Sequence, residues 1–149
     1  MFDKHIQGVI CEYLAAAWFT NNDYMVSWPF AHFGEYDFII TKEGEKPKRV
    51  QVKKVYFDNA KNRYISSLVL SHKNCDGTTR NKKYNADSFD ICAFVCVDCN
   101  VIYVVPISEI IGRRSITFYP DSDEPKISSQ RPASYERFKR DLMEKWTTD

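Results

Sequence analysis

The sequence lacks any apolar run long enough to cross a membrane. A membrane-spanning helix needs about eighteen or more consecutive apolar residues, and the 149-residue chain contains no such stretch. Its opening, MFDKHIQGVICEYLAAAW, interrupts the apolar residues with Asp3, Lys4, His5 and Glu12, unlike a secretory signal peptide. We therefore expect a soluble cytoplasmic protein that has no membrane partner.

The sequence also lacks an even set of cysteines. Its five cysteines are Cys11, Cys75, Cys92, Cys96 and Cys99. An odd number in a chain large enough to fold without cross-links favours a reducing compartment over a disulfide framework. Cys92 and Cys96 lie four residues apart in the apolar segment ICAFVCV, whereas structural zinc sites usually take four ligands from short loops. We expect buried thiols here rather than a zinc site.

A strong excess of charge is absent as well, since the net charge is only +1. The charges are nevertheless unevenly distributed. Residues 42–84 contain twelve Lys and Arg against four acids, whereas residues 1–41 contain one Lys against five acids. Residues 85–112 have a net charge of −4 and residues 113–149 a net charge of +1. A basic zone beside acidic groups is typical of a phosphate-binding site with metal-binding carboxylates, although a solvated lysine-rich loop fits this pattern equally well.

Apolar periodicity predicts a helix at each end of the chain and strands between them. Residues 2–18 repeat at helical spacing, and Ser134 precedes a second helical pattern that extends to Trp146. Segments rich in β-branched and aromatic residues predict strands over residues 24–28, 36–41, 49–57, 64–70, 89–97 and 101–105. A short helix is expected at residues 106–111, with Pro106 at its start.

Two polar segments show no sustained period. Residues 71–88 are expected to form a mobile loop that can include a short helix, and residues 113–132 hold three prolines and little pattern. The length suits a single domain over residues 1–149. The order of elements predicts an α/β or α+β fold, in which a central mixed β-sheet has flanking helices.

The segment VQVKKVYF at residues 50–57 places two polar side chains in an otherwise apolar strand. Because strand side chains alternate, Gln51 and Lys53 share one face and Val52 points to the other. The turn at residues 42–47 pairs this strand with GEYDFII, which places Asp37 opposite Val52 within a residue or two. A carboxylate, a carboxamide and an ammonium group can then converge at one point.

This set of groups fits metal-assisted phosphodiester hydrolysis. A hard cation such as Mg²⁺, or Mn²⁺ in its place, can be held by Asp37, the Gln51 side-chain carbonyl and the Val52 backbone carbonyl. Lys53 can lower the pKa of the attacking water or stabilise the negative charge that develops on the phosphate. The sequence thus predicts a metal-dependent enzyme that cuts nucleic acid.

The pattern of an aspartate, thirteen residues and then QxK resembles the PD-(D/E)xK nuclease superfamily. Two further segments support the resemblance. The opening Gly8-x-x-x-Glu12-x-x-Ala15 looks like the resolvase-type first helix of the superfamily, and residues 85–110 look like its later strand pair and proline-initiated helix. The resemblance covers residues 5–111 and leaves residues 112–149 as a C-terminal extension.

The resemblance implies a restriction-endonuclease-like core, with Asp37, Gln51 and Lys53 as catalytic residues. It also implies that Glu12 reaches the metal site, whereas a solvent-facing glutamate is an equal reading of the helix pattern. Gln51 departs from the family, which usually has Glu or Asp at this position. A neutral amide is a poorer cation ligand, so the metal is bound more weakly, Glu12 supplies the charge, or activity has been lost.

Within this superfamily, QxK and the chain length resemble the small homing endonucleases that group I introns of cyanobacteria encode. That resemblance implies a sequence-specific double-strand DNA endonuclease. It also implies a homo-oligomer, either a dimer or, as we expect, a tetramer, because a double-strand break needs two sites. Two alternatives stay open. They are an inactive DNA-binding protein of the same fold and a structure-specific nuclease like a Holliday-junction resolvase.

Basic and amide side chains of the central zone are the predicted DNA contacts. Most would bind phosphates, while Arg and Asn on loops can read base edges in the major groove. Lys54 points away from Lys53 in a regular strand, so its expected role is structural or phosphate-positioning. The predicted contacts are Lys54, Arg63, Lys73, Arg80, Asn81, Lys82 and Lys83.

Overall fold

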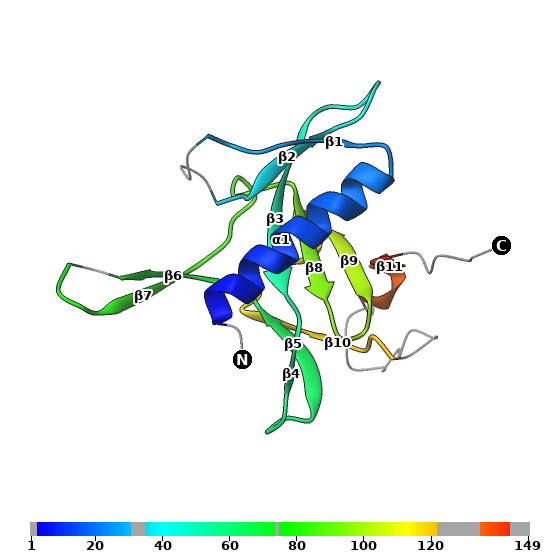
Figure 1. Cartoon of the computed structure of the whole chain (residues 1–149). Coiled ribbons are helices and arrows are strands. Elements are labelled where there is room, and N and C mark those ends of the chain that lie inside the picture. Colours follow the sequence, from blue (N-terminus) through cyan, green and yellow to red (C-terminus); the bar gives the residue numbers. More distant parts are fainter. Residues whose placement is uncertain (1–2, 31–34, 74, 122–134, 144–149) are drawn as a thin grey trace.

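The computed structural model describes residues 3–30, 35–73, 75–121 and 135–143 (Figure 1). The helices are α1 (Lys4–Asn21) and the short 3-10 helices η1 (Ile107–Glu109) and η2 (Tyr135–Phe138). The strands are β1 (Met25–Ser27), β2 (Phe38–Thr41), β3 (Lys48–Lys54), β4 (Tyr56–Asp58), β5 (Arg63–Ser67), β6 (Val69–Lys73), β7 (Thr79–Lys83), β8 (Ile91–Cys96), β9 (Val101–Pro106), β10 (Ser115–Phe118) and β11 (Lys139–Asp141).

The helix α1 follows the N-terminal pattern of the sequence. It begins after Asp3, whose carboxylate accepts a hydrogen bond from the backbone N–H of His5 at 3.3 Å. At its end, the N–H of Asn22 donates to the carbonyl of Trp18 at 3.1 Å. The predicted first helix is therefore confirmed over its described part. Within the described ranges, no helix combines the length and apolarity needed to span a membrane.

A mixed sheet forms the centre of the fold. Its strand order is β1-β2-β3-β8-β9-β11, and only the β3–β8 pair among these neighbours is parallel. The predicted fold class, a central mixed sheet in an α+β protein, is confirmed. A parallel pair needs a long crossover connection, and here the crossover contains β4, β5, β6 and β7.

One face of the central sheet is covered by α1, which crosses in front of it in Figure 1. Small side chains on the helix, Ala15 and Ala16, let its backbone approach the sheet, and Phe19 fills the space near its end. Val50 and Val52 of β3 are buried in the same cluster. This packing fixes which side of β3 faces the helix.

The other face is covered by a second sheet rather than by a helix, as far as the described residues show. This three-stranded sheet has the order β10-β5-β4. From it, Phe118 packs against Phe94 and Tyr103 of the central sheet, with ring centres 5.0 and 4.4 Å apart. The sequence predicted irregular structure over residues 113–132, and this prediction is wrong for the residues of β10. Residues 122–132 lie outside the described residues.

The predicted loop over residues 71–88 is also wrong in part. The strands β6 and β7 form a hairpin in which Lys73 pairs with Thr79 and Val69 pairs with Lys83. Figure 1 shows this hairpin extending away from the rest of the fold on the left. Gly77, with a φ of 85°, takes a left-handed backbone conformation in the connection.

The predicted C-terminal helix from Ser134 to Trp146 is wrong within the residues described. Residues 135–138 form a 3-10 turn, and β11 then pairs with β9 at the edge of the central sheet. The buried carboxylate of Glu136 accepts hydrogen bonds from the Tyr103 hydroxyl at 3.0 Å and from the Tyr119 N–H at 2.7 Å. These bonds hold the segment against the sheet. Ser134 and Trp146 lie outside the described residues.

Candidate active site

Asp37 lies where β2 and β3 stop pairing. Phe38, the first residue of β2, is opposite Val50 in the register. The N–H of Asp37 donates to the Val50 carbonyl at 2.8 Å, and its Oδ2 accepts a hydrogen bond from the Val52 N–H at 2.7 Å. Groups two residues apart on a strand point to the same side, so the carboxylate occupies the place that a longer β2 would take.

The side chains of β3 alternate between the two faces of the central sheet. Val50 and Val52 are buried against α1. Gln51 and Lys53 are half-buried, and Gln51 is in register with Cys92, which belongs to the core on the other face. The two polar side chains of the segment VQVKKVYF therefore share the face opposite the helix.

Asp37 and Lys53 both act on Cys92, the buried thiol next to them. Burial raises the pKa of Cys92, while the charge of Lys53 lowers it and the charge of Asp37 raises it. The Lys53 ammonium also lies 5.2 Å from the centre of the Tyr84 ring. Asp37 and Lys53 are half-buried, as is Gln51. Gln51 and Lys53 thus share one face of β3 at half-buried positions, and Asp37, also half-buried, lies close enough for its charge to act on the same thiol.

Glu12 reaches this place from α1. Its carboxyl group is hydrogen-bonded to that of Asp37. Burial first, then the charge of Asp37 and that hydrogen bond, raise the pKa of Glu12 to about 7. Two carboxyl groups this close cannot both ionise easily without a positive charge between them. The sequence allowed Glu12 either to reach the site of Asp37 or to face solvent. The structure places Glu12 beside Asp37.

The donor atoms around Asp37 fit a hard divalent cation. Asp37 and Glu12 contribute carboxylate oxygens. The Gln51 side-chain amide donates to the Val52 carbonyl at 3.3 Å, so an amide and a main-chain carbonyl lie at the same place. Oxygen ligands are those that Mg²⁺ and Mn²⁺ prefer. Because the described residues contain no cluster of three or more His, Cys, Asp or Glu, the cation would be held by two carboxylates and neutral oxygens.

Lys54 lies on the opposite side of β3, towards the helix. Its ammonium contacts Oε1 of Gln7 on α1. Burial raises the pKa of the Cys11 thiol, and the charge of Lys54 opposes that rise. Lys54 thus joins β3 to the first half of α1. Its side chain lies on the opposite face of β3 from that of Lys53, as the alternation of a strand predicts. Its contact with DNA stays a prediction.

The other predicted DNA contacts are distributed over two hairpins. Lys83 is exposed at the end of β7. Arg63 begins β5 in the three-stranded sheet, where the structure does not bring it together with Asp37 and Lys53. The remaining four belong to the β6–β7 hairpin, and their side chains lie outside the described part of the structure: Lys73, Arg80, Asn81 and Lys82.

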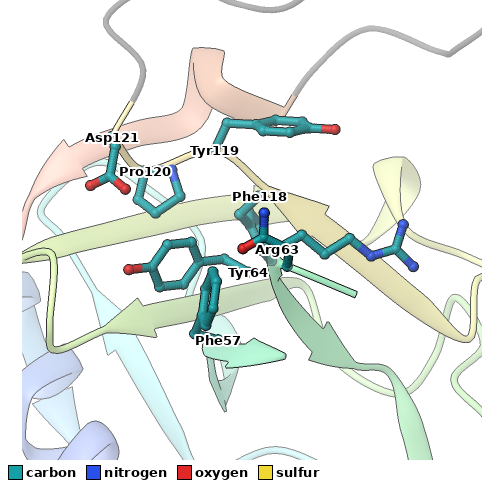
Figure 2. Close-up of a pocket in the computed structure, with 8 residues that line it drawn as sticks. Phe57, Arg63, Tyr64, Phe118, Tyr119, Pro120 and Asp121 are labelled. Carbon is teal, nitrogen blue, oxygen red and sulfur yellow. The ribbon is translucent and has the colours of Figure 1, made fainter. Parts of the chain in front are cut away.

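A separate hollow of about 410 Å³ lies beside Arg63 (Figure 2). Aromatic rings from Phe57, Tyr64 and Phe118 line it, and their chain positions are on β4, β5 and β10. In Figure 2 the Arg63 guanidinium extends away from the Tyr64 ring. None of the lining residues belongs to the Asp37 cluster, so this hollow and the candidate active site are different places.

Tyr84 is a residue of the site that the sequence analysis does not single out. It follows β7 directly, its ring packs against Phe89 at 5.0 Å, and its face lies next to Lys53. Burial raises the pKa of Tyr84, and the charge of Lys53 opposes that rise. Tyr84 is the one Tyr, Phe or Trp in the polar segment of residues 71–88, and this isolated aromatic residue is the signal that could have found it.

The comparisons with known proteins agree with this geometry. The profile of the family described as PD-(D/E)XK endonuclease matches residues 2–139, so the chain belongs to the PD-(D/E)XK endonuclease family. Nucleases of this family act on DNA and generally use divalent metals. Among curated proteins, none matches this chain.

Among solved structures, the chain is similar to the bacterial homing endonuclease I-Ssp6803I. The two share 19% sequence identity with a TM-score of 0.77, over 93% of this chain and 89% of the other. At that identity the likeness establishes the fold, which is that of a restriction-endonuclease-like nuclease.

Proposed function

We propose that this protein is a Mg²⁺-dependent, sequence-specific endonuclease that cuts both strands of duplex DNA, as an intron homing endonuclease does. The observation that carries the proposal is the Asp37 carboxylate where β2 ends, which accepts from the Val52 N–H and lies against the Glu12 carboxyl group, beside the strand that carries Gln51 and Lys53. The likeness to a bacterial homing endonuclease supports the homing part of the proposal. Mn²⁺ has the same preference for oxygen ligands and is expected to replace Mg²⁺.

Each residue of the cluster has a role that its chemistry allows. Asp37, the Gln51 side-chain carbonyl and the Val52 carbonyl hold the cation, and Glu12 supplies the second negative charge that Gln51 does not. When bound, the cation polarises the scissile phosphate and lowers the pKa of a bound water. The Lys53 ammonium orients the attacking water and stabilises the charge that grows on the phosphate oxygens.

The basic zone of residues 42–84, with a net charge of +8, supplies affinity for the phosphate backbone. Its β6–β7 hairpin projects from the fold (Figure 1), and a two-stranded ribbon of this kind fits the major groove. We assign base contacts to Arg80 and Asn81 on this hairpin. Lys73, Lys82 and Lys83 contact phosphates, whereas Lys54 and Arg63 lie nearer the body of the nuclease.

A double-strand break requires two such sites, and one chain supplies one. The active form is therefore a homo-oligomer, either a dimer or a tetramer built from two dimers. A symmetric pair of chains would place the two sites on the two strands of one target. The oligomer thus follows from the chemistry rather than from any contact within the chain.

The proposal is tested with genomic DNA from related strains that lack this gene, because a homing enzyme is expected to cut an uninterrupted target. Fragment ends are sequenced after incubation with Mg²⁺, with Mn²⁺ or with a chelator. We expect ends that recur at one site with either metal and disappear with the chelator. Uniform degradation would contradict sequence specificity.

Two further arms separate the alternatives. If neither metal gives cleavage but the protein still shifts duplex DNA in a gel, it is an inactive DNA-binding protein, as the neutral Gln51 allows. A four-way junction is compared with a linear duplex of the same sequence. Faster cleavage of the junction would favour a resolvase, the reading that the Gly8 to Glu12 opening allows, whereas a homing enzyme is expected to ignore branching.

A further inference from the structure

Tyr84 is buried although it directly follows the projecting β6–β7 hairpin. Its side chain is 6% exposed and belongs to the core cluster that also contains Phe89 and Phe94. The Lys53 ammonium lies over the Tyr84 ring, 5.2 Å from the ring centre. A cation within about 6 Å of a ring centre is attracted to the face of the ring. Tyr84 therefore joins the hydrophobic core to the proposed catalytic lysine.

The ring of Tyr84 is held in place by its surroundings. Phe89 packs against it in an edge-to-face arrangement, with ring centres 5.0 Å apart. In the turn that follows, the Asn85 N–H donates to the Ser88 hydroxyl at 3.1 Å, and the Asp87 N–H donates to the Asn85 side-chain oxygen at 2.9 Å. The backbone after Tyr84 is thus fixed, although Tyr84 lies at the end of a hairpin that extends away from the fold (Figure 1).

Arg49 fixes this turn to β3, the strand that carries Lys53. Its guanidinium donates to the Asp87 carbonyl at 2.7 Å, and its backbone N–H donates to the Asp90 carboxylate at 2.7 Å. The Asp90 N–H in turn donates to the Arg49 carbonyl at 3.0 Å. Because both the turn and Lys53 are attached to β3, the Tyr84 ring keeps its place relative to the Lys53 ammonium.

The Lys53 ammonium needs such a support. A lysine side chain is a flexible stem with a compact charge at its end, and Lys53 is only half-buried. The proposed chemistry requires the ammonium at a fixed place beside the water and the phosphate, and a displacement of about 1 Å can cost about 10²-fold in rate. A ring on one side of the ammonium restricts where the stem can go.

The Tyr84 ring, rather than the hydroxyl, is the part suited to this task. The hydroxyl oxygen is buried, and its interaction with the Lys53 ammonium falls short of a full hydrogen bond. No other group among the described residues is a hydrogen-bond partner for it. A phenylalanine would therefore keep the packing and the ring face at this position, whereas a leucine would keep an apolar side chain without the ring. These two substitutions separate the ring from the volume that it fills.

We propose that Tyr84 is a positioning residue, whose ring holds the Lys53 ammonium where it acts on the attacking water and the phosphate. Because Tyr84 is buried, it contacts neither the DNA nor the reacting atoms, and it acts through Lys53. This inference rests on the proposed function, in which Lys53 is catalytic. It adds to the site a residue from a separate segment of the chain, directly after β7.

The contact is tested without DNA or metal by NMR of lysine side chains labelled at Cε. The protons of a methylene group over a ring face resonate upfield of those of solvent-exposed lysines. We expect an upfield signal that is absent in Lys53→Ala, persists in Tyr84→Phe and loses its shift in Tyr84→Leu. Lys42, whose ammonium lies 4.9 Å from the centre of the Tyr24 ring, is the internal control, because its signal should respond to neither Tyr84 variant.

The positioning role is tested by single-turnover cleavage at saturating DNA and by a gel-shift titration. Tyr84→Leu should lower the rate by about 10- to 10²-fold, with unchanged affinity for DNA. Tyr84→Phe should keep the rate within about threefold of the wild type, since both rings present a face to the cation. The control Ile116→Ala removes a buried side chain of the same core cluster, from β10. It should be destabilised as Tyr84→Leu is, and cut DNA at the wild-type rate.

The two measurements fail separately. A wild-type Lys53 signal without an upfield shift would overturn the contact, even if Tyr84→Leu does not fold. A shifted signal together with wild-type cleavage by Tyr84→Leu, or an equal loss of rate in Ile116→Ala, would overturn the positioning role and leave the proposed function intact. If the wild type cuts no DNA with either metal, the proposed function fails, and the Lys53 signal still decides whether the contact exists.

Discussion

The Asp37 carboxylate accepts a hydrogen bond from the Val52 N–H at 2.7 Å, in the position where a longer β2 would pair with β3. One side chain therefore ends the β2–β3 ladder and begins the candidate active site. The Val52 carbonyl lies on the same open edge of β3, where the Gln51 amide donates to it. The local end of strand pairing thus provides both the acid and a main-chain oxygen at one point.

Replacing Asp37 with Asn should separate its two tasks. The Asn side-chain oxygen can still accept from the Val52 N–H, so we expect a change of less than about 1 kcal/mol in the free energy of unfolding. Metal affinity should fall, because an anionic ligand becomes neutral. Asp37→Asn is therefore expected to lose cleavage activity by about 10²-fold or more. Calorimetric titration with Mg²⁺ and chemical denaturation check the two parts, and tight Mg²⁺ binding by the variant would contradict the assignment.

Lys53→Ala should abolish cleavage and leave DNA binding largely intact. Lys53 is half-buried, and its charge acts on the same buried thiol as that of Asp37. Loss of one group that stabilises a developing charge typically costs about 10²- to 10³-fold in rate. Single-turnover cleavage and a gel-shift titration measure the two effects. Lys61→Ala removes an exposed lysine of the same basic zone and serves as the control. Unchanged turnover in Lys53→Ala would place the chemistry elsewhere.

Gln51→Glu should restore the acid that is usual at this position of the family. With the cation absent, a third carboxylate beside Asp37 and Glu12 adds repulsion, so the melting temperature in chelator should fall. With the cation present, the added charge should lower the Mg²⁺ concentration needed for half-maximal cleavage. Asn59→Asp adds the same charge at an exposed position and should do neither. A higher Mg²⁺ requirement in Gln51→Glu would show that Gln51 does not face the cation.

Glu12 should give the metal-free protein a measurable pH dependence. Its pKa in the folded chain is raised to about 7, so folding favours the protonated form, and its contribution to stability is lost as pH rises from the unfolded pKa to the folded one. In chelator, Glu12→Gln should therefore melt higher than the wild type at about pH 8.5 and nearly equal to it at about pH 4. Mg²⁺ should remove the difference. A constant gap at both pH values would mean that folding does not raise the pKa of Glu12.

The sequence predicted the first helix and β3 from the spacing of their apolar residues. The first helix was predicted from the repeat of Ile6, Val9, Ile10 and Tyr13, although these side chains are exposed and it is Cys11, Ala15 and Phe19 that are buried. The strand β3 was predicted because Val50 and Val52 alternate with polar residues. The grouping of Asp37, Gln51 and Lys53 followed from that alternation and from the hairpin register. The hydrogen bond between Asp37 and Glu12 required the tertiary structure, because it joins two elements that no local pattern relates.

The missed elements are those in which tertiary pairing decides the conformation. Among the described strands, β6 and β7 pair only with each other, so their conformation depends on this one pairing and not on a place in a larger sheet. The dipeptide Asp76-Gly77 was the available hairpin signal. The segment Lys139–Asp141 has three charged residues, yet it forms β11 because it pairs with β9 and its Asp141 carbonyl accepts from the Trp18 indole at 3.0 Å.

Gly8 offers a test of where the DNA lies. It is one helical turn before Glu12 on the same side of α1, and a Cβ built on it would have no heavy atom within 4 Å. The chain's own packing therefore does not require glycine here, although glycine in a helix costs about 0.5–1 kcal/mol relative to alanine. Filling this space tests whether the DNA backbone approaches α1 beside Gly8.

Gly8→Ala should accordingly raise the free energy of unfolding by about 0.5–1 kcal/mol, and Gly8→Leu should fold as well as the wild type. Both variants should bind duplex DNA more weakly than the wild type, and Gly8→Leu more weakly than Gly8→Ala, because the added side chain occupies space that the phosphates need. Chemical denaturation and fluorescence anisotropy measure the two quantities. Ala17→Leu, at an exposed position further along the same helix, controls for bulk alone. If Gly8→Leu binds DNA as tightly as the wild type, the duplex does not pass beside Gly8, and the glycine has another cause.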